Sequence, residues 1–211
     1  MKLRTGHMNR ALSTVLTTII ILVASVVLAT GVVLYGTSLF QTSTQQEAIS
    51  VTGLKVFTKA VDPNGLTWGA FAVRNTGDKI LSVNKITVRG GDVPFTQWYP
   101  DTNVTSALLQ QAMKFSGWSG TNGELSVDDP DADCGGTGTI QIDLDGTGGE
   151  LAVCAIAATG PIGLEPGDGA IIYFKLTNGT IESIDAGIST AVGVFAGNSG
   201  APISVTVSSK T

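Results

Sequence analysis

The chain has 211 residues, of which 43% are hydrophobic and 14% charged, and its formal net charge is −5. An acidic balance argues against nucleic-acid binding, which needs a basic patch. The only histidine, His7, lies in the first ten residues, so the remainder offers no Ser–His or Cys–His pair and no histidine metal ligand. The sequence also contains no Walker loop and no dinucleotide fingerprint. It therefore predicts neither an enzyme nor a bound cofactor.

An uncharged, largely apolar segment at residues 12–46 follows a basic leader that holds Lys2, Arg4 and Arg10. The segment exceeds the roughly 20 residues that a membrane-spanning helix needs. The basic leader predicts a cytoplasmic amino terminus, with the residues after about Phe40 exported. Because the predicted helix has no polar face, we expect it to be buried on all sides, first by lipid and then by sibling helices. Removal of the leader would leave 9 basic against 17 acidic residues, a net charge near −8.

Three kinds of processing fit this amino terminus. An ordinary signal-peptidase site at Val27-Leu28-Ala29 would leave part of the apolar run on the mature protein. A cut between Ala11 and Leu12, after the basic Arg10, would keep the whole apolar helix attached. Without any cut, the helix would act as a signal anchor for a domain on the cell surface.

The basic leader, Arg10-Ala11 and the apolar helix that opens at Leu12-Ser13 resemble the class III signal of archaeal type IV pilins and archaellins. Residues 54–57 and 72–80 resemble the first strands of the β-domain in that family. The resemblance implies that a prepilin peptidase removes residues 1–11 and that residues 12–50 form a filament-core helix. It also implies an extracellular, Ig-like β-sandwich at residues 51–211.

Two positions in the helix bear on the branch of the family. Leu16 stands where bacterial type IV pilins usually carry Glu, which favours the archaeal branch. Thr14 stands where archaellins commonly carry Gly, which favours an adhesion pilus over the archaeal motility filament.

The function implied by the resemblance is that of a structural subunit of an extracellular, pilus-like helical filament. Its partners would be identical subunits, the prepilin peptidase, an assembly ATPase, a membrane platform and a surface or cell target. The precursor would reside in the cytoplasmic membrane. An archaellin is the alternative within the family. A signal-anchored, monomeric surface-binding module is the alternative of another class.

After residue 46 short apolar runs alternate with turn residues, which predicts an all-β domain. The expected strands are residues 54–59, 67–74, 80–89, 138–144, 151–157, 170–176, 190–195 and 203–208. This number of short strands suggests a single Ig-like sandwich. Asn178-Gly179 predicts a hairpin between residues 170–176 and 180–184.

Residues 93–125 interrupt the strand pattern as an insertion. A short helix is expected at residues 104–114. Around it stand the aromatic residues Trp98, Tyr99, Phe115 and Trp118. They are expected to form a small satellite core beneath a long loop, and the alternative is a binding surface for glycan, a partner or a neighbouring subunit.

Two covalent features are expected of an exported domain. Cys134 and Cys154, the only cysteines, predict a disulfide that would stabilise the fold by roughly 3 kcal/mol in the chain-entropy model. The sequons at Asn103 and Asn178 permit N-glycosylation.

An acidic loop precedes Cys134. Asp129, Asp131 and Asp133 have the opening spacing of an EF-hand calcium loop. The match then fails, because Cys134 stands where Gly is needed and Ile140 stands where Glu is needed. A solvated acidic loop is therefore favoured over a metal site.

Overall fold

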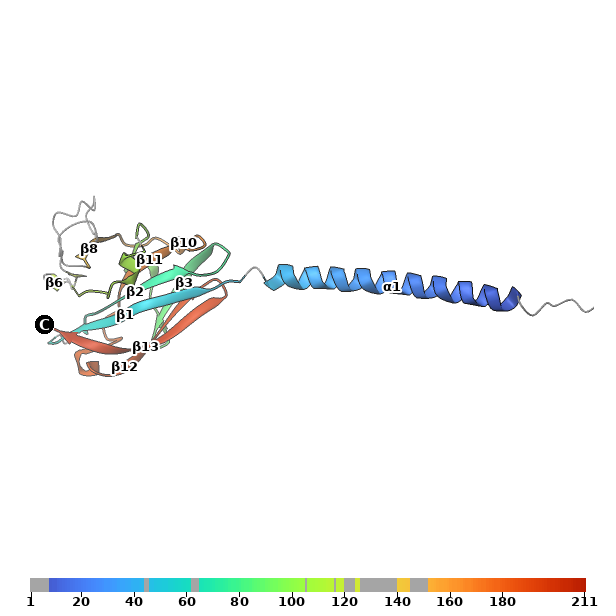
Figure 1. Ribbon diagram of the computed structural model, residues 1–211. Coiled ribbons are helices and arrows are strands. Elements are labelled where there is room, and N and C mark those ends of the chain that lie inside the picture. The colour runs from blue at the N-terminus through green and yellow to red at the C-terminus, as the bar shows by residue number, and fades with distance from the viewer. Residues whose placement is uncertain are drawn as a thin grey trace, which may run out of the picture. The chain divides into compact units, whose positions relative to one another are not determined.

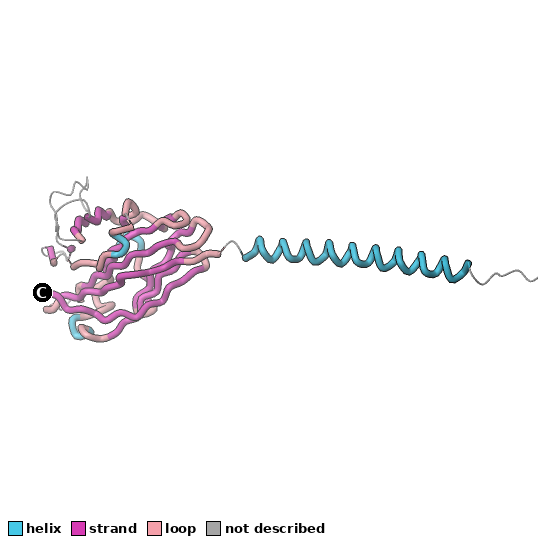
Figure 2. The backbone as a smooth tube through the Cα atoms, in the orientation of Figure 1, coloured by secondary structure: helices cyan, strands magenta, loops and turns pink. Residues whose placement is uncertain are grey.

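The computed structural model describes residues 8–43, 46–61, 65–104, 106–115, 117–119, 124–125, 140–144 and 152–211. The chain divides into two compact units, Met1–Gln45 and Gln46–Thr211, whereas the sequence placed the boundary at 50/51. The described part of the first unit is one helix, and the second unit is mostly β (Figures 1 and 2). The prediction of a long apolar helix followed by a β-domain is confirmed at this level.

The helix α1 comprises Met8–Ser43, so it begins four residues before the predicted start at residue 12. It does not reach the predicted end at residue 50, because Ile49 already belongs to the first strand. Its central part, Ser13–Leu39, is 27 residues long with a mean hydropathy of 2.6, which is long and apolar enough to cross a membrane. Valine, isoleucine and threonine are poor helix formers in water. In an apolar medium the backbone must satisfy its own hydrogen bonds, and the helix then becomes the required state.

The described part of the β-domain consists of thirteen strands and three 3-10 turns. The strands are β1 (Ile49–Lys59), β2 (Thr67–Asn75), β3 (Leu81–Val88), β4 (Gly91–Asp92), β5 (Trp98–Asp101), β6 (Trp118–Ser119), β7 (Glu124–Leu125), β8 (Ile140–Asp143), β9 (Ala152–Ala155), β10 (Ile162–Leu164), β11 (Gly169–Lys175), β12 (Ser189–Ala196) and β13 (Ser199–Lys210). The 3-10 turns are η1 (Phe95–Gln97), η2 (Leu108–Gln110) and η3 (Ser183–Asp185). All eight predicted strands are found, and β1 and β13 begin earlier than expected.

Most strands belong to one curled sheet in the order β10-β3-β12-β13-β1-β2-β11-β5, with β4 beside β3. Every neighbouring pair is antiparallel except β1 and β13, which pair in parallel from Val56↔Val207 to Lys59↔Lys210. Before Val56, β1 pairs only with β2, and before Val207, β13 pairs only with β12. The two halves of the sheet therefore diverge, and the main core lies between them, with Phe71, Ile86 and Val194 fully buried.

Strands β2 and β11 are buried on both faces, which explains their nearly continuous apolar sequences. One face contributes to the main core. The other face carries Trp68 and Tyr173 into a second core, which Met113 and, from β8 and β9, Ile142 and Val153 cover. Residues of the insertion together with β8 and β9 thus add a further layer to the curled sheet.

The predicted hairpin at Asn178-Gly179 is wrong. A turn does occur there, with Gly179 at φ +84°, but no strand follows it before η3. Strand β11 already pairs with β2 along one edge and with β5 along the other, so a returning strand has no free edge to join. The chain instead buries Ile181 in the main core.

The predicted helix at residues 104–114 is also wrong, because only the single 3-10 turn η2 forms within its described residues. Leu108 and Met113 are both buried in the second core although they are five residues apart, a spacing that one face of an α-helix does not provide. The segment lies as an irregular strip against the sheet.

Candidate functional site

The surface of α1 is apolar and exposed along most of its described length. The described side chains from Ser13 to Leu39 are exposed, apart from the half-exposed Gly36. Val32 is 71% exposed, and Leu28 and Leu34 are each 69% exposed. Apolar residues occur on all sides of this helix, so no orientation on a water-exposed surface would bury them together. The helix requires an apolar environment around its whole circumference.

Five hydroxyl groups of α1, those of Thr17, Thr18, Ser25, Thr30 and Thr37, donate to backbone carbonyls within the helix. Thr17 Oγ1 donates to the Ser13 carbonyl at 2.8 Å and Ser25 Oγ to the Leu22 carbonyl at 2.8 Å. Thr30 and Thr37 bond in the same way to carbonyls of the preceding turn. Such bonds remove the need for water at these side chains. The helix surface is therefore suited to lipid or to other helices along its length.

The predicted cleavage junction lies at the beginning of this helix. Arg10, Ala11 and Leu12 all belong to α1, close to its first residue, Met8. Cleavage between Ala11 and Leu12 stays a prediction.

The first residues of the β-domain are fixed to it by a turn. The Ala48 carbonyl accepts from Thr76 N at 2.9 Å, and the Gln46 carbonyl accepts from Asp78 N at 3.2 Å. A side chain on Gly77 would collide with the backbone at Gln46 and Ala48. The segment that follows α1 is thus held by hydrogen bonds before the first strand begins.

Glu47 adds side-chain contacts to this attachment. Its Oε2 accepts from Asn198 N at 2.9 Å, and its Oε1 lies 3.9 Å from Lys79 Nζ.

A bidentate ion pair joins the β3–β4 turn to the segment before β12. Arg89 Nη2 lies 2.8 Å from Asp185 Oδ1, and Arg89 Nη1 donates to Asp185 Oδ2 at 3.0 Å. This hydrogen bond is the main cause that lowers the pKa of Asp185, and the Glu182 backbone N–H lowers that pKa further. The same bond with Asp185 raises the pKa of Arg89. Arg89 holds this geometry at φ +52°, a backbone conformation that favours glycine.

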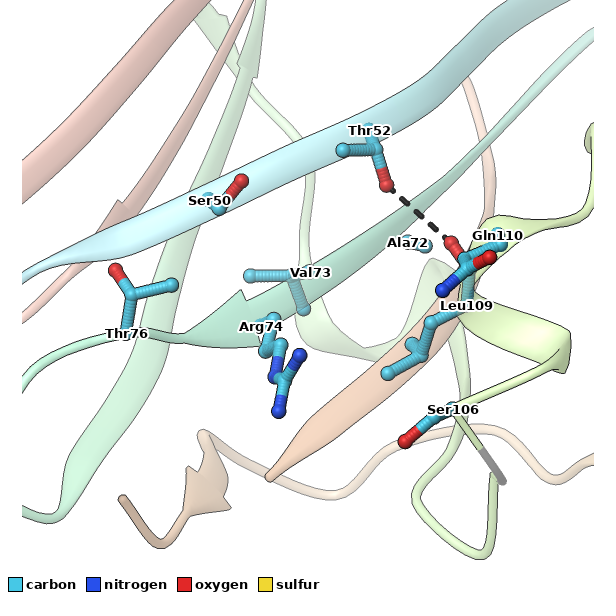
Figure 3. A pocket seen from close by; sticks show the side chains of 9 residues that line it. All are labelled: Ser50, Thr52, Ala72, Val73, Arg74, Thr76, Ser106, Leu109 and Gln110. Atoms are coloured by element: carbon cyan, nitrogen blue, oxygen red, sulfur yellow. Dashed lines mark hydrogen bonds between the residues drawn. The ribbon is translucent and has the colours of Figure 1, made fainter. Parts of the chain in front are cut away.

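A hollow of about 240 Å³ opens beside β1, β2 and η2 (Figure 3). It is lined by Ser50, Thr52, Ala72, Val73, Arg74, Thr76, Ser106, Leu109 and Gln110. At its margin Thr52 Oγ1 donates to the Leu109 carbonyl at 3.4 Å. No sequence pattern marks these residues as a site, because they become neighbours only when η2 folds back over β1 and β2.

Three aromatic residues of the insertion, Trp98, Tyr99 and Phe115, belong to the cores, and the side chain of Trp118 lies outside the described part of the chain. Trp98 is 1% exposed, and its Nε1 donates to the Val93 carbonyl at 3.0 Å. Tyr99 packs against Trp68 with ring centroids 5.1 Å apart, and Phe115 packs against Phe57 at 5.5 Å. The expected satellite core is therefore found for Tyr99 and Phe115, whereas Trp98 joins the main core.

Other predicted site residues fall partly outside the described part of the chain. Asp129, Asp131, Asp133 and Cys134 lie outside it, so the acidic-loop interpretation and the disulfide to Cys154 stay predictions. Within the described ranges, no group of three or more His, Cys, Asp or Glu side chains could hold a metal ion.

Cys154 and the sequon asparagines are described. Cys154 is half-buried, and its backbone N–H donates to Asp101 Oδ2 at 2.8 Å. Asn103 and Asn178 are both exposed, as a glycosylation acceptor must be. Their occupancy stays a prediction.

The chain matches no protein-family model, and no curated protein matches it significantly.

Proposed function

We propose that the chain is the structural subunit of an archaeal type IV pilus-like filament on the cell surface. The observation that carries the proposal is the helix Ser13–Leu39, which is apolar on every side and exposed along its length. In the membrane, lipid supplies the surroundings that this helix needs. In a filament, the same surroundings come from the helices of identical subunits, and the β-domains coat the outside.

The transfer from lipid to a helix bundle involves little change in hydrophobic burial, because both surroundings are apolar. Packing between helices then determines the stability of the filament. The hydroxyl groups bonded within α1 reduce the cost of that transfer, since they need no partner in either medium. A shallow apolar hollow along Ala29, Thr30, Val33 and Leu34 offers space for side chains of a neighbouring helix.

Within the family, we favour an Ig-like sandwich of the pilin type for the β-domain. Parallel pairing of the first and last long strands, antiparallel pairing elsewhere and a core between diverging half-sheets support this assignment. An adhesion pilus is favoured over an archaellum because Thr14 replaces the glycine common in archaellins. Deleting the gene should impair surface attachment and leave swimming intact; the reverse result would identify an archaellin.

The proposal is tested at the cleavage junction. Ala11→Phe places a bulky side chain where the peptidase of this family needs a small one, and Thr5→Phe is the matched control within the leader. We expect Ala11→Phe to leave uncut precursor in the membrane and no filaments by electron microscopy, with normal filaments for the control. Filaments of normal abundance from Ala11→Phe would refute the proposal.

A signal-anchored binding module is the second candidate, because one apolar helix near an amino terminus is also what an anchor or a signal sequence provides. It predicts an uncut amino terminus and no filament. The burial of Trp98 removes one residue from the carbohydrate surface that this alternative would use.

A further inference from the structure

The hollow beside η2 combines one cationic group with several neutral hydrogen-bonding groups. Ser50 pairs with Arg74 and Thr52 with Ala72 in the β1–β2 register, so these residues share one face of the sheet. Hydroxyl or amide groups come from Ser50, Thr52, Thr76, Ser106 and Gln110, and none of the nine lining residues is acidic. The hollow therefore presents a single positive charge among groups that can both donate and accept hydrogen bonds.

The two arginines of the β-domain have different partners. Both terminal nitrogens of Arg89 bind Asp185. Arg74 donates from Nε to the Gly167 carbonyl at 3.0 Å, and within the described residues no carboxylate lies within ion-pair distance of it. Figure 3 shows its guanidinium extending from β2 on the side of the hollow where Ser106 lies. The bond to Gly167 orients the guanidinium and leaves its terminal nitrogens available to a ligand.

We propose that this hollow binds a sugar acid, with the carboxylate on the terminal nitrogens of Arg74 and the ring hydroxyls on the surrounding side chains. A guanidinium fork matches a carboxylate in shape and in charge. A single cation balances one negative charge, which favours a carboxylate over a doubly charged phosphate. The volume of about 240 Å³ lies just below the roughly 300 Å³ at which ordinary small-molecule sites begin, so it suits one sugar-sized group. The proposal does not depend on filament formation.

The test uses the full chain in detergent micelles and three small probes observed by saturation-transfer NMR. Galacturonate carries both the carboxylate and the hydroxyl groups, galactose carries the hydroxyl groups alone, and acetate carries the carboxylate alone. We expect galacturonate to receive saturation from the protein. Galactose and acetate should each bind at least about tenfold more weakly, since each lacks one set of hydrogen bonds.

Three variants locate the binding. Arg74→Gln should weaken galacturonate binding by about tenfold or more, since it removes a charge-assisted pair. Lys55→Gln is the matched control, because it removes one positive charge from an exposed β1 residue that does not line the hollow. Ser106→Ala keeps Arg74 and its bond to Gly167, and should weaken binding by a smaller factor without changing the thermal unfolding temperature.

Several results would overturn the proposal. The proposal would be wrong if galacturonate did not bind. It would also be wrong if galacturonate bound Arg74→Gln as tightly as the parent chain, because Arg74 would then not contact the ligand. Equally tight binding of galactose removes the role of the carboxylate. Equally tight binding of acetate would indicate a plain anion site in place of a site for a sugar acid.

Discussion

A charge placed in the middle of α1 should separate a filament-core helix from a membrane anchor. Leu28 lies near the centre of the apolar stretch Ser13–Leu39 and is 69% exposed. We expect Leu28→Lys to leave the precursor in the membrane and to abolish filaments. Leu28→Met, which keeps an apolar side chain of similar volume, is the control and should preserve both.

The expected magnitudes differ between the two environments. The stretch Ser13–Leu39 contains fourteen Leu, Ile and Val residues. At roughly −0.3 to −0.6 kcal/mol each, these residues together favour membrane insertion by about 4 to 8 kcal/mol. One lysine at the helix centre makes the free energy of insertion less favourable by about 3 kcal/mol. Insertion therefore survives, helped by snorkelling and local water. In a bundle of apolar helices, every subunit would bury an unpaired ammonium group, which costs several kcal/mol per subunit.

Membrane fractionation measures the precursor, and electron microscopy of sheared surface material measures the filaments. Normal filaments from Leu28→Lys would refute the reasoning, because the helix would then not lie in an apolar core. Loss of the precursor from the membrane would instead show that the insertion estimate is wrong.

Four further predictions concern the stability of the β-domain, measured by denaturant unfolding of the full chain in detergent. Arg89→Ala should be less stable than Arg89→Gly by about 1 kcal/mol. Both variants lose the partly exposed ion pair, but only glycine adopts the positive φ of this position without strain. Equal stabilities would contradict this. The pKa of Asp185 is lowered in the folded state. The Arg89–Asp185 pair therefore contributes its full stabilisation of the folded state above the unfolded pKa, and this stabilisation is lost as pH falls below about 4. The advantage of the parent chain over Asp185→Asn should therefore vanish in acid, and an advantage that is constant with pH would argue against the pair. Gly69→Ala should destabilise by about 1 to 3 kcal/mol, because a methyl group would enter the ring of Phe174 on the paired strand; a neutral effect would show that the ring can move. Asn75→Ala should cost about 2 kcal/mol or more, since its buried amide bonds three backbone groups; a loss below 0.5 kcal/mol, on the order of a surface change, would contradict this.

The alternation of apolar runs with turn residues was sufficient to predict the main strands. The residues of β2 and β11 must be apolar because both strands are buried, and this requirement does not depend on which strand lies beside them. The pairing between distant segments could not be predicted in the same way. The parallel contact at Val56↔Val207 joins residues from opposite ends of the domain, and no local pattern specifies it.

Two of the errors in the prediction have a common physical cause. Asn178-Gly179 has the residues of a hairpin turn, but tertiary pairing had already filled both edges of β11. Strand β5, which the prediction left within the insertion, contains Pro100, which an edge strand tolerates and a central strand does not. In each case the deciding factor was the position of a strand within the sheet, which the local sequence does not contain.

The candidate sites were predictable to different extents. The apolar helix is evident from composition, because a long uncharged run needs no tertiary information. The hollow is not, because Arg74 and Ser106 are separated in sequence and meet only through the fold. The sequence also does not show which arginine of the β-domain has a carboxylate partner. The structure pairs Arg89 with Asp185 and bonds Arg74 to the Gly167 carbonyl.

The amino-terminal peptide of protein sheared from the cell surface tests the central claim most directly. Mass spectrometry should find a mature chain that begins at Leu12, with the whole apolar helix retained. A chain that begins at Thr30 would indicate an ordinary secreted protein, and an intact leader would indicate a membrane-anchored domain. Either result would contradict a filament subunit assembled through α1.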